Sequence, residues 1–266
     1  AIEVLSAIEE TLWQGVANLI GKETSRLSGE RVSVNQVNLL APIPRPRRNI
    51  ICVGKNYVAH AEEFSGSGFD SSAAQGAIPA APIIFSKLPE TVVAHGDAVL
   101  IDKRVSVAID YEAELCVIIG RTGRAISREE AMDYVWGYTI INDITARDLQ
   151  ITHSQWFISK SQDTFCPMGP VAVTRDEIDL ADTAVKCWVN DELRQSANTA
   201  DLIFDVPTLI ATISSGITLY PGDLIATGTP AGVGIGFTPP KYLRPGDVVR
   251  VEVDGIGVLE NRMVEA

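Results

Sequence analysis

The chain has 266 residues, of which 46% are hydrophobic and 21% charged, a composition typical of a folded globular protein rather than a disordered one. Acidic residues outnumber basic ones by 34 to 22, and the net charge of −12 argues against nucleic acid or an anionic membrane surface as a partner. No hydrophobic run approaches the roughly 18 residues that span a bilayer, so we expect a cytoplasmic protein. The four cysteines form no C-x-x-C pair and the three histidines are far apart, so any metal would be held by oxygen.

The first 45 residues are expected to form a small N-terminal region, followed by a catalytic domain over residues 46–266. Hydrophobic residues recur at helical spacing over residues 3–21 and predict an amphipathic helix. Weak alternation predicts a strand over residues 31–40. The proline-rich residues 41–48 must be extended, because each proline disfavours helix at the residue before it, and they mark the boundary.

Residues 109–120 are predicted to form one strand that carries two acidic side chains. Glu112 and Glu114 are two residues apart, so on a strand their carboxylates leave the same face. A hard divalent cation, Mg²⁺ or Mn²⁺, could lie between two such charges; the alternative is the solvated polar face of an edge strand. Asp143 ends another strand, predicted over residues 137–143, and would supply a third oxygen ligand.

A short helix is predicted over residues 56–64, after a buried strand at residues 49–54, with Asn56 as a possible N-cap. His60 and Glu63 are three residues apart and share one face of this helix. A carboxylate beside an imidazole fixes its orientation, which suits a general base that takes a proton from water. The alternative is an exposed ion pair on a surface helix.

Further elements complete the predicted domain. Residues 65–81 are rich in Gly, Ser and Ala and long enough to be a lid or binding loop. The other predicted elements, in chain order, are strands over residues 82–87 and 98–101, a short helix after the capping box of residues 127–130, a helix over residues 202–215, and a hairpin that turns at residues 254–255.

Two segments supply candidates for binding a substrate. Arg147, Gln150 and Lys160 could bind a substrate carboxylate, or could be charges on a surface loop. The glycine-rich residues 222–236 match neither a Walker A loop nor a dinucleotide-binding turn. Their backbone N–H groups could approach a ligand, with Thr229 donating its hydroxyl.

An ordered set of motifs covers roughly residues 45 to 263, and such a set is far more specific than any one of its members. Its members are Val53-Gly54-Lys55-Asn56-Tyr57, His60 with Glu63, Asp110-Tyr-Glu-Ala-Glu-Leu115, Asn142-Asp143, Ala146-Arg-Asp-Leu-Gln150, Lys160, Asp163-Thr164 and Gly222-Asp-Leu-Ile-Ala-Thr-Gly-Thr-Pro230. In this order they resemble the fumarylacetoacetate hydrolase family. The resemblance implies an α+β, β-rich fold of mixed, rolled β-sheets, and usually a homodimer.

The resemblance also implies roles for individual side chains. It implies Mg²⁺ or Mn²⁺ bound by three carboxylates: Glu112, Glu114 and Asp143. It implies side chains that touch the substrate or line its pocket: Tyr57, Arg147, Gln150 and Thr229. It implies a catalytic set of His60, Glu63 and Lys160, and support for the metal ligands from Lys160 and Thr164.

The function expected from this resemblance is metal-dependent hydrolysis of a C–C bond in a 2,4-dioxo acid of the acylpyruvate or fumarylpyruvate type. His60 would take a proton from the attacking water, and the cation would stabilise the enolate that becomes pyruvate. Isomerisation of an unsaturated 2-hydroxy dioic acid is the second reaction, and decarboxylation of oxaloacetate the third. The alternative outside catalysis is a silent dimeric protein that binds a small 2-oxo or 2,4-dioxo acid.

Overall fold

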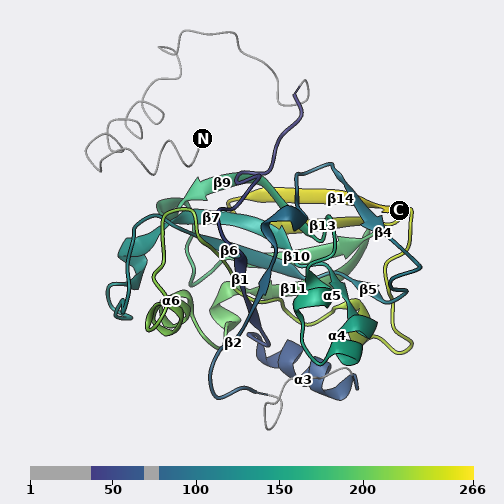
Figure 1. The fold of residues 1–266 in the computed structure, drawn as a ribbon, viewed down its shortest axis with the longest axis horizontal. Helices are drawn as coiled ribbons and strands as arrows, with labels where there is room; N and C mark the ends of the chain where they lie inside the picture. Colours follow the sequence, from purple (N-terminus) through teal and green to yellow (C-terminus); the bar gives the residue numbers. More distant parts are fainter. Residues whose placement is uncertain (1–36, 69–77) are drawn as a thin grey trace.

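The computed structural model describes residues 37–68 and 78–266, shown in colour in Figure 1. The helix predicted over residues 3–21 and most of the strand predicted over residues 31–40 lie outside the described residues. Residues 37–40 form no strand. The division of the chain at residue 45 therefore stays a prediction.

A seven-stranded mixed sheet forms the centre of the described chain, in the order β2-β1-β12-β6-β7-β9-β3 (Figure 1). Its strands are β1 (Ile50–Gly54), β2 (Ile83–Lys87), β3 (Val92–Val93), β6 (Ala113–Ile119), β7 (Val135–Asn142), β9 (Cys166–Thr174) and β12 (Leu224–Ala226). The pairs β1–β12 and β3–β9 are parallel and the others antiparallel. Every residue of β6 is buried, as expected for a strand covered on both faces.

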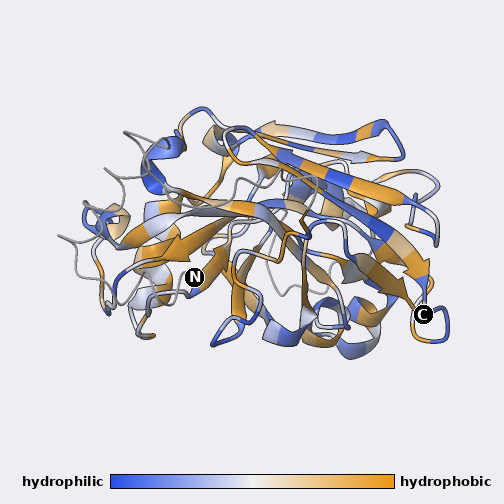
Figure 2. Ribbon diagram, turned by 90° about the horizontal axis from the view of Figure 1, so that it is seen from above, coloured by the Kyte–Doolittle hydropathy of each residue, from blue (hydrophilic) through white to orange (hydrophobic). Residues whose placement is uncertain are grey.

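A five-stranded sheet packs against the first, in the order β11-β10-β13-β14-β4. Its strands are β4 (Ala98–Ile101), β10 (Ala184–Val189), β11 (Glu192–Asn198), β13 (Val248–Val253) and β14 (Gly257–Glu265). Alternate residues of β13, among them Val249 and Val251, are buried and join one core with Leu115 and Val117 of β6. Figure 2 shows this concentration of hydrophobic residues in the strands. The predicted hairpin at residues 254–255 is confirmed.

Short helices and one small ladder complete the fold. The α-helices are α3 (Val58–Gly66), α4 (Arg147–His153), α5 (Phe157–Lys160) and α6 (Val206–Ser214), and β5 (Ile109–Asp110) pairs with β8 (Thr145–Ala146). Figure 1 places α3, α4 and α5 together at one end of the central sheet. Within the described chain no helix is long and hydrophobic enough to cross a membrane. The predicted β-rich α+β fold of mixed sheets is confirmed.

The predicted strand over residues 109–120 divides into β5 and β6 at Tyr111 and Glu112. Side chains replace the ladder hydrogen bonds there, because the Tyr111 N–H donates to Asp110 Oδ1 at 2.9 Å and the Glu112 N–H to Asn142 Oδ1 at 3.1 Å. The break frees Glu112 from a regular strand and still leaves its carboxylate beside that of Glu114.

Three predicted helix starts are corrected. Tyr57, not Asn56, is the N-cap of α3, because the Asn56 amide donates instead to the carbonyls of Phe204 and Thr227. The helix predicted over residues 202–215 begins only at Val206, because Asp205 is the N-cap of α6. The capping-box hydrogen bonds between Ser127 and Glu130 form, but only a 3-10 helix follows them, at Ala131–Tyr134.

Candidate active site

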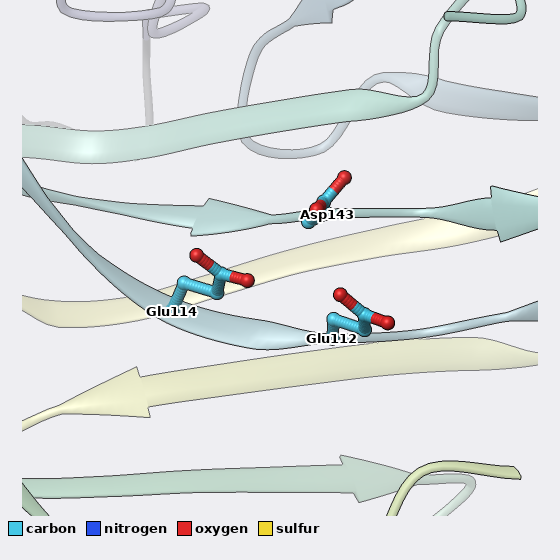
Figure 3. A group of neighbouring side chains, drawn as sticks. All are labelled: Glu112, Glu114 and Asp143. Atoms are coloured by element: carbon cyan, nitrogen blue, oxygen red, sulfur yellow. The ribbon is translucent and has the colours of Figure 1, made fainter. Parts of the chain in front are cut away.

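Three carboxylates from neighbouring strands meet at one end of the central sheet. One oxygen from each of Glu112, Glu114 and Asp143 lies within 4.8 Å of the other two, and Figure 3 shows the three side chains on the same side of their strands. The antiparallel register of β6 and β7 opposes Ala113 to Asn142, which brings Asp143 beside Glu112. All three are buried and β6 lies between β12 and β7, so the alternative of a solvated edge strand does not hold.

Buried cations surround two of these carboxylates. Lys160 Nζ lies 2.7 Å from both Glu112 Oε2 and Asp143 Oδ2. Lys87 Nζ lies 2.7 Å from the other oxygen of Asp143, and Arg147 Nη2 lies 2.7 Å from Glu112 Oε1. Lys87 also donates to the carbonyl oxygens of residues 144 and 160, so it joins the segment after β7, which carries Asp143, to the end of α5.

Burial and the neighbouring charges shift the pKa values of the two glutamates in opposite directions. Burial alone would raise the pKa of Glu112, but Lys160 and Arg147 outweigh it and lower the pKa to about 2. Burial raises the pKa of Glu114 well above its ordinary value, and the charges of Asp143 and Glu112 raise it further. The Lys160 and Arg147 charges thus favour the ionised form of Glu112, whereas burial and the neighbouring carboxylates disfavour the ionised form of Glu114.

The surroundings of Glu114 fit a divalent cation. Within the described residues Glu114 has no ion-pair partner, and the Gly228 N–H donates to its Oε2 at 2.8 Å. A buried carboxylate without a cation, next to two others, is an arrangement that Mg²⁺ or Mn²⁺ relieves, since both ions prefer oxygen ligands. Glu112, Glu114 and Asp143 would hold it, and its binding stays a prediction.

A histidine and a glutamate form the second part of the site. His60 Nδ1 lies 3.3 Å from Glu63 Oε2, and His60 is 5% exposed. The Gly232 N–H donates to both oxygens of Glu63, at 3.0 and 3.2 Å. The pair is thus held between α3 and the glycine-rich run, and the alternative of an exposed surface ion pair does not hold.

One residue from each of these two parts, Glu112 and His60, lines the same pocket. It is lined by six side chains predicted from the sequence: His60, Glu112, Arg147, Gln150, Lys160 and Thr229. Three aromatic rings complete the wall: Phe64, Phe85 and Trp156.

Two predicted site residues lie elsewhere. The Tyr57 ring is buried and is not part of the pocket lining; its backbone bridges to Leu202, and burial raises its pKa. The hydroxyl oxygen of Thr164 accepts from the Leu100 N–H at 2.8 Å and donates to the carbonyl of Asp163. Neither contact reaches the three carboxylates, and the support of the metal ligands by Thr164 stays a prediction.

Sequence reasoning assigned no role to two residues that build the site. Lys87 ends a short strand, where a lysine normally reaches solvent, and nothing nearby in the sequence indicates its burial. Asp110 was noted only as part of a motif. Its Oδ2 lies 2.9 Å from Arg147 Nε, so it fixes the arginine that lines the pocket.

The glycine-rich run approaches carboxylates of the protein itself rather than a ligand. The Gly228 N–H donates to Glu114, the Gly232 N–H to Glu63, and the Gly234 N–H to Asp110 at 2.6 Å. Thr229 lines the pocket, but its hydroxyl oxygen accepts from Gln195 Nε2 at 2.7 Å. The predicted ligand contacts of these backbone groups are thus replaced by internal ones.

Residues 49–264 match the family described as fumarylacetoacetate (FAA) hydrolase C-terminal. The chain belongs to this family. It is 52% identical over 243 residues to oxaloacetate tautomerase YisK of Bacillus subtilis. The match covers 91% of this chain and 78% of that protein. The order of motifs in the sequence therefore identifies the family correctly.

Two solved structures of the fumarylacetoacetate hydrolase family show how varied its reactions are. A 2-hydroxyhepta-2,4-diene-1,7-dioate isomerase from Mycobacterium marinum is 36% identical, with a TM-score of 0.75, and the match covers 91% of this chain and 83% of that one. A maleylpyruvate hydrolase from Sphingobium sp. SYK-6, in complex with manganese(II) and pyruvate, is 34% identical, with a TM-score of 0.78 and coverage of 100% and 85%. Family membership thus shows an enzyme fold without selecting one reaction.

Proposed function

We propose that this protein is an enzyme that interconverts the keto and enol forms of a short 2-oxo dicarboxylic acid such as oxaloacetate, with Mg²⁺ or Mn²⁺ as cofactor. The observation that carries the proposal is the buried cluster of three carboxylates, whose Glu112 lines the same pocket as His60 of the His60–Glu63 pair. The identity of 52% with an oxaloacetate tautomerase favours this reaction over the others.

The protein's own groups divide the work between charge and proton transfer. A divalent cation held by Glu112, Glu114 and Asp143 would act as a Lewis acid toward the 2-oxo group. Burial lowers the pKa of Lys160, but the charges of Asp143 and Glu112 outweigh burial and raise the pKa above its ordinary value. Lys160 is therefore an ammonium group in the pocket lining. Its charge stabilises negative charge that develops on the substrate oxygen.

His60 is the group placed to move the proton. The Glu63 carboxylate can only accept at Nδ1, so the His60 ring carries its proton on Nδ1 and presents Nε2 as an acceptor. In the forward direction the C3–H bond breaks and its proton passes to Nε2. The electron pair of that bond forms the C2–C3 double bond, the C2–O π pair moves to the 2-oxo oxygen, and this oxygen then takes the proton back from Nε2. No carbon–carbon bond breaks in this reaction.

Hydrolysis of a C–C bond in a 2,4-dioxo acid is the second candidate. The same His60–Glu63 pair supports it, because a base that can remove a proton from C3 can equally remove one from water. The likeness to a maleylpyruvate hydrolase also supports it. Isomerisation of a longer unsaturated acid and loss of CO₂ from oxaloacetate need the same cation site, so product analysis must separate the four.

The experiment that tests the proposal supplies the enol form of oxaloacetate, acylpyruvates and fumarylpyruvate separately, each with Mg²⁺, with Mn²⁺ and with EDTA. Enol absorbance, pyruvate and CO₂ are followed together. We expect accelerated loss of the enol band with oxaloacetate, dependent on metal and without pyruvate or CO₂. Pyruvate from a dioxo acid would establish the hydrolase instead, CO₂ the decarboxylase, and no turnover with any substrate the silent binding protein.

The homodimer and the cytoplasmic location expected from the sequence stay predictions. Size-exclusion chromatography with light scattering tests the first: we expect twice the chain mass of 28.7 kDa. Elution at the chain mass would contradict the dimer.

A further inference from the structure

Apart from Thr229, which lines the pocket, and Gly228, which donates to Glu114, the glycine-rich run has no role in the reaction proposed above. We propose that its residues 232–236, here called the glycine loop, position the pocket's base. The loop holds the Glu63 carboxylate, and Glu63 in turn decides which ring nitrogen of His60 carries the proton. This inference rests on the proposed role of His60, and its first measurement is independent of that role.

The glycine loop touches the Glu63 carboxylate from two sides. The Gly232 N–H donates to both carboxylate oxygens, at 3.0 and 3.2 Å. At Gly236 a Cβ atom would lie 2.0 Å from Glu63 Oε1 and 2.2 Å from Cδ, far inside contact distance. Gly232 itself has φ +101°, and a Cβ there would lie 1.8 Å from the carbonyl oxygen of Arg194. Only glycine at both positions lets the loop close on the carboxylate.

These contacts matter because little else fixes the Glu63 side chain. Its only other hydrogen bond within the described residues is the one to His60, at 3.3 Å. The helix that carries both residues, α3, has no side-chain hydrogen bond at its N-cap. The loop therefore supplies the tertiary contacts that aim the carboxylate at Nδ1, and a displaced carboxylate would leave the ring free to exchange tautomers.

The same loop holds a second carboxylate that orients a pocket side chain. The N–H groups of Gly234 and Ile235 donate to Asp110 at 2.6 and 3.0 Å, and Asp110 binds Arg147 Nε. A Cβ at Gly234 would lie 2.7 Å from Asp110 Oδ1. The alternating glycines thus make room for two carboxylates, one behind the histidine and one behind the arginine.

Gly236→Ala is the probe, because the three atoms nearest to the added methyl group all belong to the Glu63 carboxyl end. Gly216→Ala is the matched control: its methyl group meets no atom within 4 Å, and neither Gly216 nor Gly236 has a positive φ. Thermal unfolding of both variants checks that they fold. Glu63→Gln is the second variant, which alters the carboxylate without changing the loop.

The first measurement is the ¹⁵N spectrum of the histidine rings, which reports the tautomer of each of the three histidines. We expect His60 with its proton on Nδ1 in the unmodified protein and in Gly236→Ala a shift toward a mixture. His95 is an internal reference, because its Nδ1 accepts from the Glu260 N–H at 3.1 Å and its proton must be on Nε2. We expect the His95 signals to be the same in Gly236→Ala as in the unmodified protein. An unchanged His60 in Gly236→Ala would overturn the inference.

The second measurement is a double-mutant cycle on turnover. We expect Gly236→Ala to lower kcat by about 10- to 100-fold, less than the roughly 10²- to 10⁴-fold contribution of a general base because the base is displaced rather than lost, with little change in KM. In a Glu63→Ala background the same change has no carboxylate to displace and lowers kcat no further. A loss that persists there would show that the loop acts through something other than Glu63. An altered tautomer with unchanged turnover would support the loop's role and overturn the role of His60 as the base.

Discussion

The site has two parts, here called the sheet wall and the helix wall, and they are built in opposite ways. On the wall formed by the central sheet, both oxygens of Asp143 lie 2.7 Å from a lysine nitrogen, and Asp143, Lys87 and Lys160 are at most 2% exposed. On the wall formed by α3, His60 and Glu63 are joined by one contact of 3.3 Å, and the Glu63 side chain is 17% exposed.

This difference separates a fixed part of the site from an adjustable one. Removing one partner of a buried ion pair leaves an uncompensated charge, so the sheet wall tolerates few changes in its geometry. The helix wall depends on backbone hydrogen bonds from a loop and on an uncapped helix. We infer that the sheet wall sets where charge is stabilised, while the helix wall can shift without unfolding the protein.

Lys87→Met is expected to have the largest effect on stability, because it leaves Asp143 buried with only one of its two lysines. We expect a loss of about 3–5 kcal/mol in the free energy of unfolding, measured by urea denaturation. The control is Lys103→Met, which breaks an ion pair to Glu265 whose side chains are 55% and 64% exposed. No measurable change is expected for the control, and equal losses in the two variants would contradict a fixed sheet wall.

Asp205→Ala is expected to have a smaller effect, since it gives α6 the same uncapped start as α3. Asp205 Oδ1 accepts from the Thr208 N–H at 3.0 Å, and losing such a cap removes about 1 kcal/mol. Burial raises the pKa of Asp205, but the hydrogen bonds from Thr208 and Arg128 outweigh it and lower the pKa below its ordinary value. A lowered native pKa gives stability that is present above pH about 4 and lost as the pH falls through the native value.

The check on Asp205 is therefore a pair of denaturation curves at two pH values. We expect the difference between Asp205→Ala and the unmodified protein to be full at pH 7 and to shrink below pH 4. A difference that stays constant over this range would show that the carboxylate charge contributes nothing to the cap.

Glu63→Gln is expected to have the smallest effect on stability and a large one on turnover. The glutamine oxygen can still accept from Gly232, so we expect a change below about 0.5 kcal/mol. Turnover should fall by roughly 10²- to 10⁴-fold, as for loss of an oriented general base. The neighbouring Glu62→Gln, on the exposed side of α3, is the control and should change neither quantity. A loss in the free energy of unfolding of Glu63→Gln as large as that of Lys87→Met would contradict the contrast between the two walls.

The sequence was informative where the signal is local or repeated. Hydrophobic residues alternate strictly along β13, and the chain turns after it at residues 254–255. Both features were predicted and both appear in the structure. Glu112 and Glu114 share a site because their spacing survives the strand break between β5 and β6. The order of motifs then identified the family, which no single motif could do.

The parts that were not predicted depend on contacts between distant segments. Lys87 Nζ donates to carbonyl oxygens 57 and 73 residues further along the chain, and no local pattern encodes that meeting. Asn56 fits an N-cap by type, but its amide binds residues 148 and 171 positions away. The glycine loop was expected to approach a ligand, because spacing cannot show that its partners are Glu63 and Asp110.

Binding of Mn²⁺ tests the account most directly, because both the charge balance of the sheet wall and the proposed reaction depend on it. Electron paramagnetic resonance of free Mn²⁺ is followed while the unmodified protein, Glu114→Gln and the exposed control Glu129→Gln are titrated. We predict tight binding by the unmodified protein and Glu129→Gln, and affinity at least about 100-fold weaker in Glu114→Gln. Equal affinity in all three, or no binding by any, would contradict the three-carboxylate site.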